Sequence, residues 1–238
     1  MANPIRKGAV NSTTTAARSI NEGLRAYMLK IYNLMALGLT VTGAIAYYVG
    51  NTPEILHMIY GTPLQWVVML APLGLVMFLG FRLQSMSVTT AQAVYWLYAS
   101  LMGLSLSYIF VRYPSASIAR AFFISAGTFG AMSLYGYTTK KDLTAMGSFL
   151  FMGLIGLVIA SLVNLFLKSS ALSFITSLIG VLVFTGLTAY DTQKLKLMYS
   201  ANRDSAMGEK LAIYGALQLY LDFINIFLSL LRLMGDRK

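Results

Sequence analysis

The sequence predicts an all-α polytopic membrane protein built as a bundle of seven transmembrane helices. Of its 238 residues, 57% are hydrophobic and only 11% are charged, which lies well away from the composition of soluble domains. The apolar residues gather in seven segments, each near the roughly 20 residues that a helix needs to cross a bilayer. Helices are expected because a backbone in lipid must satisfy its polar groups within the segment.

The predicted spans follow one another closely along the chain. In order, they cover residues 26–49, 64–81, 89–111, 117–137, 143–167, 171–191 and 211–234. The first is too long an apolar stretch for the core of a signal peptide. The connections at 138–142 and 168–170 are very short, so they join antiparallel neighbours in one compact bundle. No stretch is long enough for a separate soluble domain.

The chain divides into two predicted regions. Residues 1–25 are polar and form a flexible cytoplasmic N-terminal tail, and residues 26–238 form a single transmembrane domain. Orientation follows from the excess of Lys and Arg on the cytoplasmic side of membrane proteins. One side collects Arg6, Lys7, Arg18, Arg25, Arg82, Lys140, Lys141, Lys194, Lys196, Arg203 and Lys210, and the other collects Arg112, Arg120, Lys168, Arg232, Arg237 and Lys238. The larger group predicts a cytoplasmic N-terminus, with the C-terminus on the far side.

The net charge of +10 does not indicate nucleic-acid binding. The basic residues are scattered at helix ends, where long side chains reach the membrane interface, and they form no face interleaved with stacking aromatic residues. The expected partner is therefore the lipid bilayer. The chain has no Cys, and His57 has no partner at metal-ligand spacing, so no tightly bound cofactor is expected.

A polar seam runs along the last predicted span. Spacings of 4, 4, 3, 4 and 3 residues place its members on one face of a helix: Tyr214, Gln218, Asp222, Asn225, Ser229 and Arg232. The sixth span ends in Tyr190-Asp191-Thr192-Gln193, which supplies a second carboxylate. Carboxylates are costly in hydrocarbon, so the two indicate ion or proton handling, or intramembrane proteolysis.

Asp191 and Asp222 are predicted to meet. If the sixth helix continues to about Ala201 and the seventh begins near Leu211, the two residues reach nearly the same height. Two carboxylates in contact in a poorly hydrated site cannot both ionise cheaply, so they would share a proton. Protonated, the pair would join the two helices; ionised, it would repel itself and admit a cation. The alternative for Asp191 is a helix end at the interface beside Lys194.

A hard cation such as Ca²⁺ would suit the oxygen atoms of this site. The two aspartates are the predicted ligands, and the neighbouring amides of Gln218 and Asn225 could add further oxygens. Together with Tyr214 and Ser229, these amides are predicted to line the ion path. The site would then act as a pH-dependent gate for a cation rather than as an enzyme.

Two stretches of the sequence resemble the paired signatures of the Bax inhibitor-1 family. Residues 185–194 contain Tyr-Asp-Thr-Gln, ending at Gln193, and residues 219–228 contain Asp-Phe-Ile-Asn, starting at Asp222. The run from Tyr135 to Asn164 is also similar. The resemblance covers essentially everything after the N-terminal tail, and the chain looks like a member of the bacterial, YccA-like branch.

The resemblance implies a central last helix and a pH-sensitive calcium leak of the bacterial inner membrane, gated by Asp191 and Asp222. In the family, a second-helix arginine can pair with the two aspartates, and Arg82 in Gly80-Phe81-Arg82 is the candidate here. The alternative role for Arg82 is an interface anchor. The bacterial branch also resembles proteins that bind and modulate the membrane protease FtsH, and the 1–25 tail fits that role.

Two other classes of protein compete with the leak. Intramembrane aspartyl proteases resemble one another in a Gly-x-Gly-Asp motif and a later Pro-Ala-Leu, but here the second aspartate follows Tyr220-Leu221 and no Pro-Ala-Leu occurs. The second class is a non-transporting partner protein, such as a modulator of FtsH, in which the seam only joins helices through buried hydrogen bonds.

Overall fold

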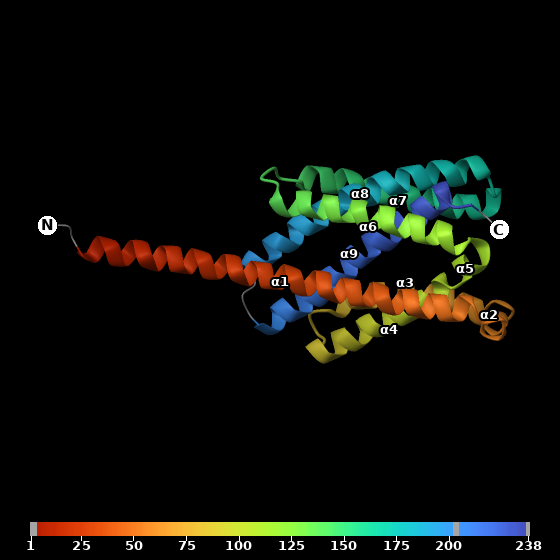
Figure 1. Cartoon of the computed structure of the whole chain (residues 1–238), viewed down its shortest axis with the longest axis horizontal. Coiled ribbons are helices and arrows are strands. Elements are labelled where there is room, and N and C mark those ends of the chain that lie inside the picture. Colours follow the sequence, from red (N-terminus) through yellow and green to blue (C-terminus); the bar gives the residue numbers. More distant parts are fainter. Residues whose placement is uncertain (1–3, 202–204, 237–238) are drawn as a thin grey trace.

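The computed structural model describes the backbone of residues 4–201 and 205–236 and the side chains of residues 21–199 and 207–236. Within these residues all regular structure is helical, which confirms the predicted fold class (Figure 1). The helices are α1 (Pro4–Gly50), α2 (Pro53–Tyr60), α3 (Leu64–Arg82), α4 (Val88–Leu106), α5 (Tyr108–Arg112), α6 (Ser115–Thr138), α7 (Thr144–Leu167), α8 (Ser170–Ala201) and α9 (Ser205–Met234).

Within the residues that the structure describes, seven segments are long and apolar enough to cross a membrane, as the sequence predicted. They are Asn21–Gly50, Leu64–Arg82, Val88–Arg112, Ser115–Thr138, Thr144–Leu167, Ser170–Tyr199 and Met207–Met234. The largest difference from the prediction is at the sixth span, because α8 continues through the polar residues that follow Asp191. Helix α1 begins at Pro4, so it includes most of the segment predicted as a tail.

The third span contains a helix break that hydropathy did not predict. Helix α4 ends at Leu106, and the short helix α5 follows after Ser107. The Tyr60 hydroxyl lies 2.9 Å from the carbonyl oxygen of Leu104 and 3.0 Å from that of Ser105, and the Ser107 hydroxyl donates to the Leu104 carbonyl as well. These side chains satisfy carbonyls that a continuous helix would have used, so the break is tolerated inside a membrane.

Helix α9 is the central helix of the bundle. In its most apolar window 67% of residues are buried, against at most 28% in any other span. It contacts α8, α1, α6 and α4, and Figure 1 shows it crossing the molecule between the α6–α8 layer and the α1–α4 layer. A last helix that is shielded on several sides can keep polar side chains away from lipid.

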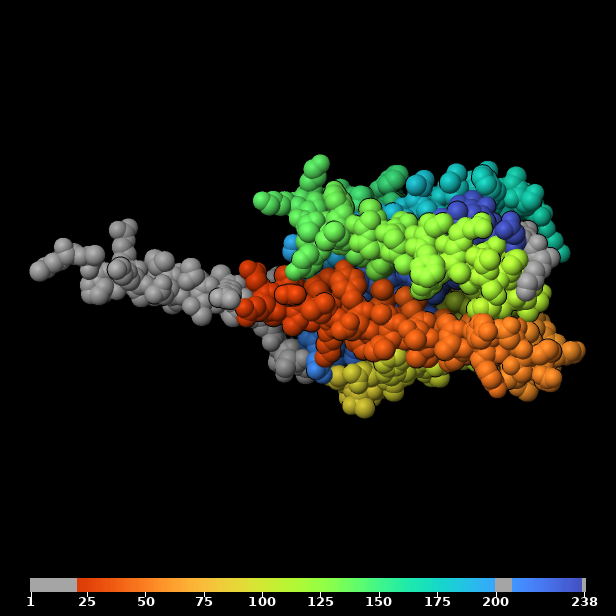
Figure 2. All heavy atoms as spheres, viewed as in Figure 1, coloured from red at the N-terminus to blue at the C-terminus, as the bar shows by residue number. Residues whose placement is uncertain are grey.

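The outer surface of the bundle is apolar. Large hydrophobic side chains of α3 and α7 are exposed, among them Trp66, Phe81, Phe149 and Phe166. Figure 2 shows one face of the bundle, on which α1, α2 and α6 lie. This surface is suited to lipid, in which exposed hydrocarbon has no cost.

One end of the bundle gathers lysines. The α6–α7 loop, residues 139–143, lies at the end from which α1 projects in Figure 1, as do the last turns of α8 and the start of α9. We call this the cationic end, after Lys140, Lys141, Lys194, Lys196 and Lys210.

Two glycines bring α8 and α9 close together and fix their antiparallel register. A Cβ on Gly215 would lie 2.6 Å from a methyl carbon of Leu195, and one on Gly180 would lie 2.7 Å from the Ser229 hydroxyl. Small residues allow this approach, which replaces the hydrophobic drive that is lost in lipid. The register places Asp191 and Asp222 about one helical turn, roughly 5 Å, apart in height.

Candidate functional site: a buried carboxylate pair

Asp191 and Asp222 lie inside the bundle on adjacent helices. Asp191 is 8% exposed and Asp222 is 4% exposed. Because α8 runs ten residues beyond Asp191, this residue is an interior position of its helix and not the helix end of the alternative interpretation. Both aspartates are therefore shielded from lipid by protein.

The two carboxyl groups lie within hydrogen-bonding range of each other. Ionised carboxylates are only acceptors, so a hydrogen bond between them requires one proton on the pair. The Oδ2 atom of Asp222 has no hydrogen-bond partner among the described residues. Buried polar atoms normally find a partner, so Oδ2 is where the proton shared with Asp191, a water molecule or a cation would bind.

The basic residue nearest to Asp191 along α8 is Lys194. It lies three residues after Asp191 on α8, and its charge interacts with the Asp191 carboxylate. The Lys194 ammonium also sits over the ring of Tyr190, 5.9 Å from its centroid. This cation–π contact holds the lysine at the side of α8 that faces α7.

Arg82 is not brought to the carboxylate pair. It is exposed at the end of α3, a helix that packs mainly against α4 and α2. Within the described part of the chain, no hydrogen bond or ion pair joins Arg82 to Asp191 or Asp222. Its position at the cationic end matches the alternative role of an interface anchor.

The other polar side chains of the seam differ in burial and in the hydrogen-bonding atoms that they leave free. Gln218 is half-buried, and its Oε1 atom has no partner among the described residues. The Asn225 amide donates a 2.8 Å hydrogen bond to the Leu221 carbonyl of its own helix, which leaves its side-chain oxygen as an acceptor. Ser229 is buried against Gly180, and Tyr214 is half-buried. The unpaired oxygens thus cluster near Asp222.

The site suits a passing cation better than a permanently held one. No group of three or more His, Cys, Asp or Glu residues that could hold a metal ion occurs among the described residues. Protein sites that retain Ca²⁺ supply six to eight oxygens, often from several carboxylates. Two aspartates with one or two amide oxygens offer fewer, so any Ca²⁺ here would keep part of its water shell.

A buried hydroxyl network beside the pair was not predicted. The Thr42 hydroxyl lies 2.7 Å from the Tyr220 hydroxyl and donates a 2.7 Å hydrogen bond to the Ala99 carbonyl. The ring of Tyr98 packs edge-on against that of Tyr220, with centroids 5.4 Å apart. The network anchors α9 to α1 and α4. Tyr220 belongs to the same motif as Asp222, but nothing in the apolar sequence around Thr42 marks it as a partner.

The fold and the site define a class: a multi-pass α-helical membrane protein with a carboxylate pair buried between its last two spans. Residues 24–238 match the family model described as "Inhibitor of apoptosis-promoting Bax1". The chain is 53% identical to the protein RP147 of Rickettsia prowazekii, over 95% of this chain and 96% of that protein. It is 48% identical to the inner membrane protein YbhL of Escherichia coli K12, over 91% of this chain and 94% of YbhL.

A more distant relative is a membrane protein of Streptococcus pyogenes serotype M3, 35% identical over 90% of this chain and 93% of that protein. The range matched by the family model includes the positions of both aspartates. The chain belongs to the Bax inhibitor-1 family.

Proposed function

We propose that the protein is a pH-sensitive leak for Ca²⁺ or another hard cation, gated by the Asp191–Asp222 pair. The observation that supports this most directly is the contact between two buried carboxyl groups, one of which has an unpartnered oxygen. Intramembrane acids of this kind mark ion or proton pathways, because hydrocarbon makes them costly without a function. The inner-membrane name of YbhL supports the bacterial inner membrane as the location.

The gate follows from the charge on the pair. With one proton, the two carboxyl groups share a hydrogen bond that joins α8 to α9. Without it, two negative charges a few ångströms apart repel strongly where water is scarce. That repulsion favours separation of the helices or entry of a cation between them, so a higher pH opens the leak.

The path continues along the seam of α9. A cation that leaves the pair meets the oxygens of Gln218 and Asn225, which can replace part of its hydration shell. Towards the far side the path narrows where Ser229 packs against Gly180. In the proposed leak, this contact is the constriction that must open for an ion to pass.

The test is Ca²⁺ flux into liposomes that contain the purified protein, measured across a range of pH. Replacing Asp191 or Asp222 by Asn keeps the size of the side chain but removes the charge, so we expect the pH dependence to disappear or shift. Asp142→Asn is the control, since Asp142 is an exposed loop residue. A clear flux with the same pH dependence in all four proteins would contradict the gate.

The flux test also separates the leak from a partner role. A protein that only binds and modulates the FtsH protease, with the seam joining helices, would give no flux above empty liposomes. The same preparation with K⁺, Na⁺ and Ca²⁺ as alternative cargo identifies the ion. Loss of flux in Gln218→Leu with retained folding would support the proposed path.

A further inference from the structure

Gln193 joins the α6–α7 loop to helix α8. Its Nε2 atom donates a 2.8 Å hydrogen bond to the Lys141 carbonyl, and its Oε1 atom accepts a 2.9 Å hydrogen bond from the Leu143 backbone N–H. Gln193 is 9% exposed, so both bonds are largely shielded from water. Removing the amide would leave buried backbone groups without partners. We call these two hydrogen bonds the loop clamp.

The loop clamp lies next to the carboxylate pair. Gln193 follows Asp191 by two residues, so the two side chains point to nearly opposite sides of the same helical turn. One turn of α8 therefore has Asp191 on the side of α9 and Gln193 on the side of the loop. A force on the loop reaches Asp191 through a few backbone hydrogen bonds.

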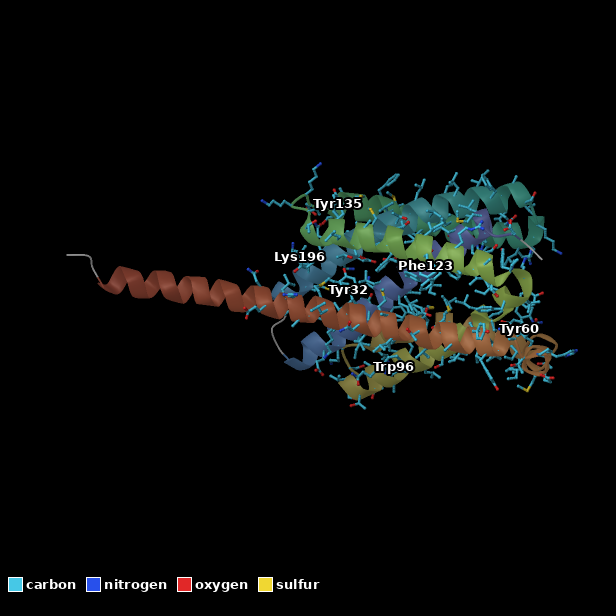
Figure 3. The ribbon with its side chains drawn as sticks, in the orientation of Figure 1. Tyr32, Tyr60, Trp96, Phe123, Tyr135 and Lys196 are labelled. Atoms are coloured by element: carbon cyan, nitrogen blue, oxygen red, sulfur yellow. The ribbon has the colours of Figure 1, made fainter. Side chains whose placement is uncertain are left out.

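A second tie holds the same part of α8. The Lys196 ammonium donates a 2.9 Å hydrogen bond to the Tyr137 carbonyl at the end of α6 and lies over the Tyr137 ring, 5.4 Å from its centroid. Figure 3 labels Lys196 at the cationic end of the bundle. The cationic end of α8 is thus fixed by polar contacts to α6 and the loop.

Space for movement lies beside the loop clamp. A pocket of about 270 Å³ is lined by Thr144, Tyr190, Gln193, Lys194, Leu197 and Met198. It lies between the start of α7 and the last turns of α8. Packing does not fill this side of the loop clamp, so a displaced loop meets empty space beside Gln193.

We propose that Gln193 is a positioning residue, which holds the α6–α7 loop on α8 and thereby fixes Asp191 within the carboxylate pair. A displacement of the loop at the cationic end then changes the protonation of the pair. The loop clamp does not depend on the proposed function. Only the effect of the clamp on the carboxylate pair rests on that function.

The charges around Asp191 are few, so the effect of the clamp can be isolated. Asp222 of α9 and Lys194 of α8 act on Asp191, and α7 has no titratable side chain. The other helices that pack on α8 also have titratable side chains at the cationic end: Tyr135 and Tyr137 of α6, Tyr27 and Lys30 of α1, and Glu209 and Lys210 of α9. Of these, Lys30 and Glu209 form an ion pair of 3.0 Å. A neutral substitution of Gln193 alters none of these charges.

The first arm of the test measures the clamp with a spin label. The chain has no Cys, so Lys140→Cys provides a single labelling site in the exposed loop. In Gln193→Met, which keeps the shape and removes both hydrogen bonds, we expect the mobile fraction of the label to rise about tenfold. Gln84→Met, at an exposed glutamine in the loop after α3, is the control. Equal mobility in both variants would overturn the clamp.

A second variant, Gln193→Glu, distinguishes loss of the loop clamp from general misfolding. A protonated carboxyl has one donor and one acceptor, as the amide does, whereas an ionised carboxyl only accepts. In Gln193→Glu the label should therefore be held at low pH and released as pH rises. The unsubstituted protein should hold its label across the same range. Release at every pH, or at none, would contradict the hydrogen-bond geometry.

The second arm measures the pair without using ion flux. Infrared difference spectra, with isotope-labelled aspartate, follow the band of the protonated carboxyl as pH changes. In Gln193→Met we expect its midpoint to move to lower pH by about half a unit, because water that enters a loosened site favours the ionised form. A midpoint equal to that of Gln84→Met overturns the coupling. Absence of any such band overturns the shared proton of the proposed function, while the spin-label arm still decides the clamp.

Discussion

Gly136→Ala is expected to push helix α6 away from α8 and destabilise the protein. A Cβ at residue 136 would lie 2.9 Å from the carbonyl carbon and from the Cα of Ala189, and closer still to the carbonyl oxygen. Carbon atoms in contact prefer about 3.5–4.0 Å, so the helices must separate by about 0.6–1 Å. The obstacle is backbone, which cannot rotate aside as a side chain can.

The expected cost is about 1–3 kcal/mol, the usual range for adding a methyl group to a packed interior. Gly127→Ala on the same helix is a matched control, because a Cβ there meets nothing within 4 Å. Reversible unfolding in mixed micelles, followed by the fluorescence of the two Trp residues, gives the free energy of unfolding of each variant. Equal stability of the two variants would refute the close approach of α6 to the backbone of α8.

Three further outcomes test other parts of the structure. Tyr220→Phe removes the hydroxyl that bonds Thr42, so we expect a loss of about 1 kcal/mol in the same unfolding assay. Thr42→Val combined with it should cost more again, because it also removes the hydrogen bond to the Ala99 carbonyl, but the total should be less than the sum of the two single changes. Hydrogen bonds from the side chain and the backbone of Thr144 hold the pKa of Asp142 below its ordinary value. The hydrogen bonds from Thr144 to Asp142 should therefore be complete above that ordinary value and be lost only as pH falls through the lowered one, measured as amide exchange of Thr144. A cysteine at Lys168 should react with an impermeant thiol reagent only from outside the cell if the N-terminus is cytoplasmic; labelling only from inside would reverse the orientation.

The membrane spans could be predicted because their signal is contained in each segment. Hydropathy located all seven, and the short connection at 168–170 predicted the antiparallel neighbours α7 and α8. The same expectation was wrong for α6 and α7, which are joined at 138–142 but pack mainly against α8 and hardly against each other. Helices α2 and α5 escaped prediction because eight and five residues are too few for a hydropathy window to separate from a loop. The break at Ser107 depends on Tyr60, which is distant in sequence.

The site was predictable where spacing along one helix determines it. The seam of α9 follows from 3.6-residue periodicity, and the proximity of Asp191 and Asp222 follows from an antiparallel pair with a known turn. The prediction of nearly the same height was less accurate, because the close contacts of Gly180 and Gly215 set a register about one helical turn away from it. Contacts between distant segments left no such signal. The end-of-helix position of Arg82 could not reveal that α3 packs mainly against α4 and α2, and a sequence cannot show that Gln193 bonds the backbone of the loop.

The glycine contacts limit which part of α8 can respond to a charge on Asp191. In the part of α8 that precedes Asp191, three close contacts hold the helix: Gly180 with Ser229, Gly186 with Leu150, and Gly136 with Ala189. Beyond Asp191, towards the cationic end, Leu195 packs closely on Gly215 of α9. The ties to α6 and its loop there are hydrogen bonds of side chains, which exchange more readily than close backbone packing yields. Repulsion within the pair should therefore displace α8 at its cationic end. Helix α8 would then pivot about its glycine contacts, and the first bonds to break would be those of Gln193 and Lys196.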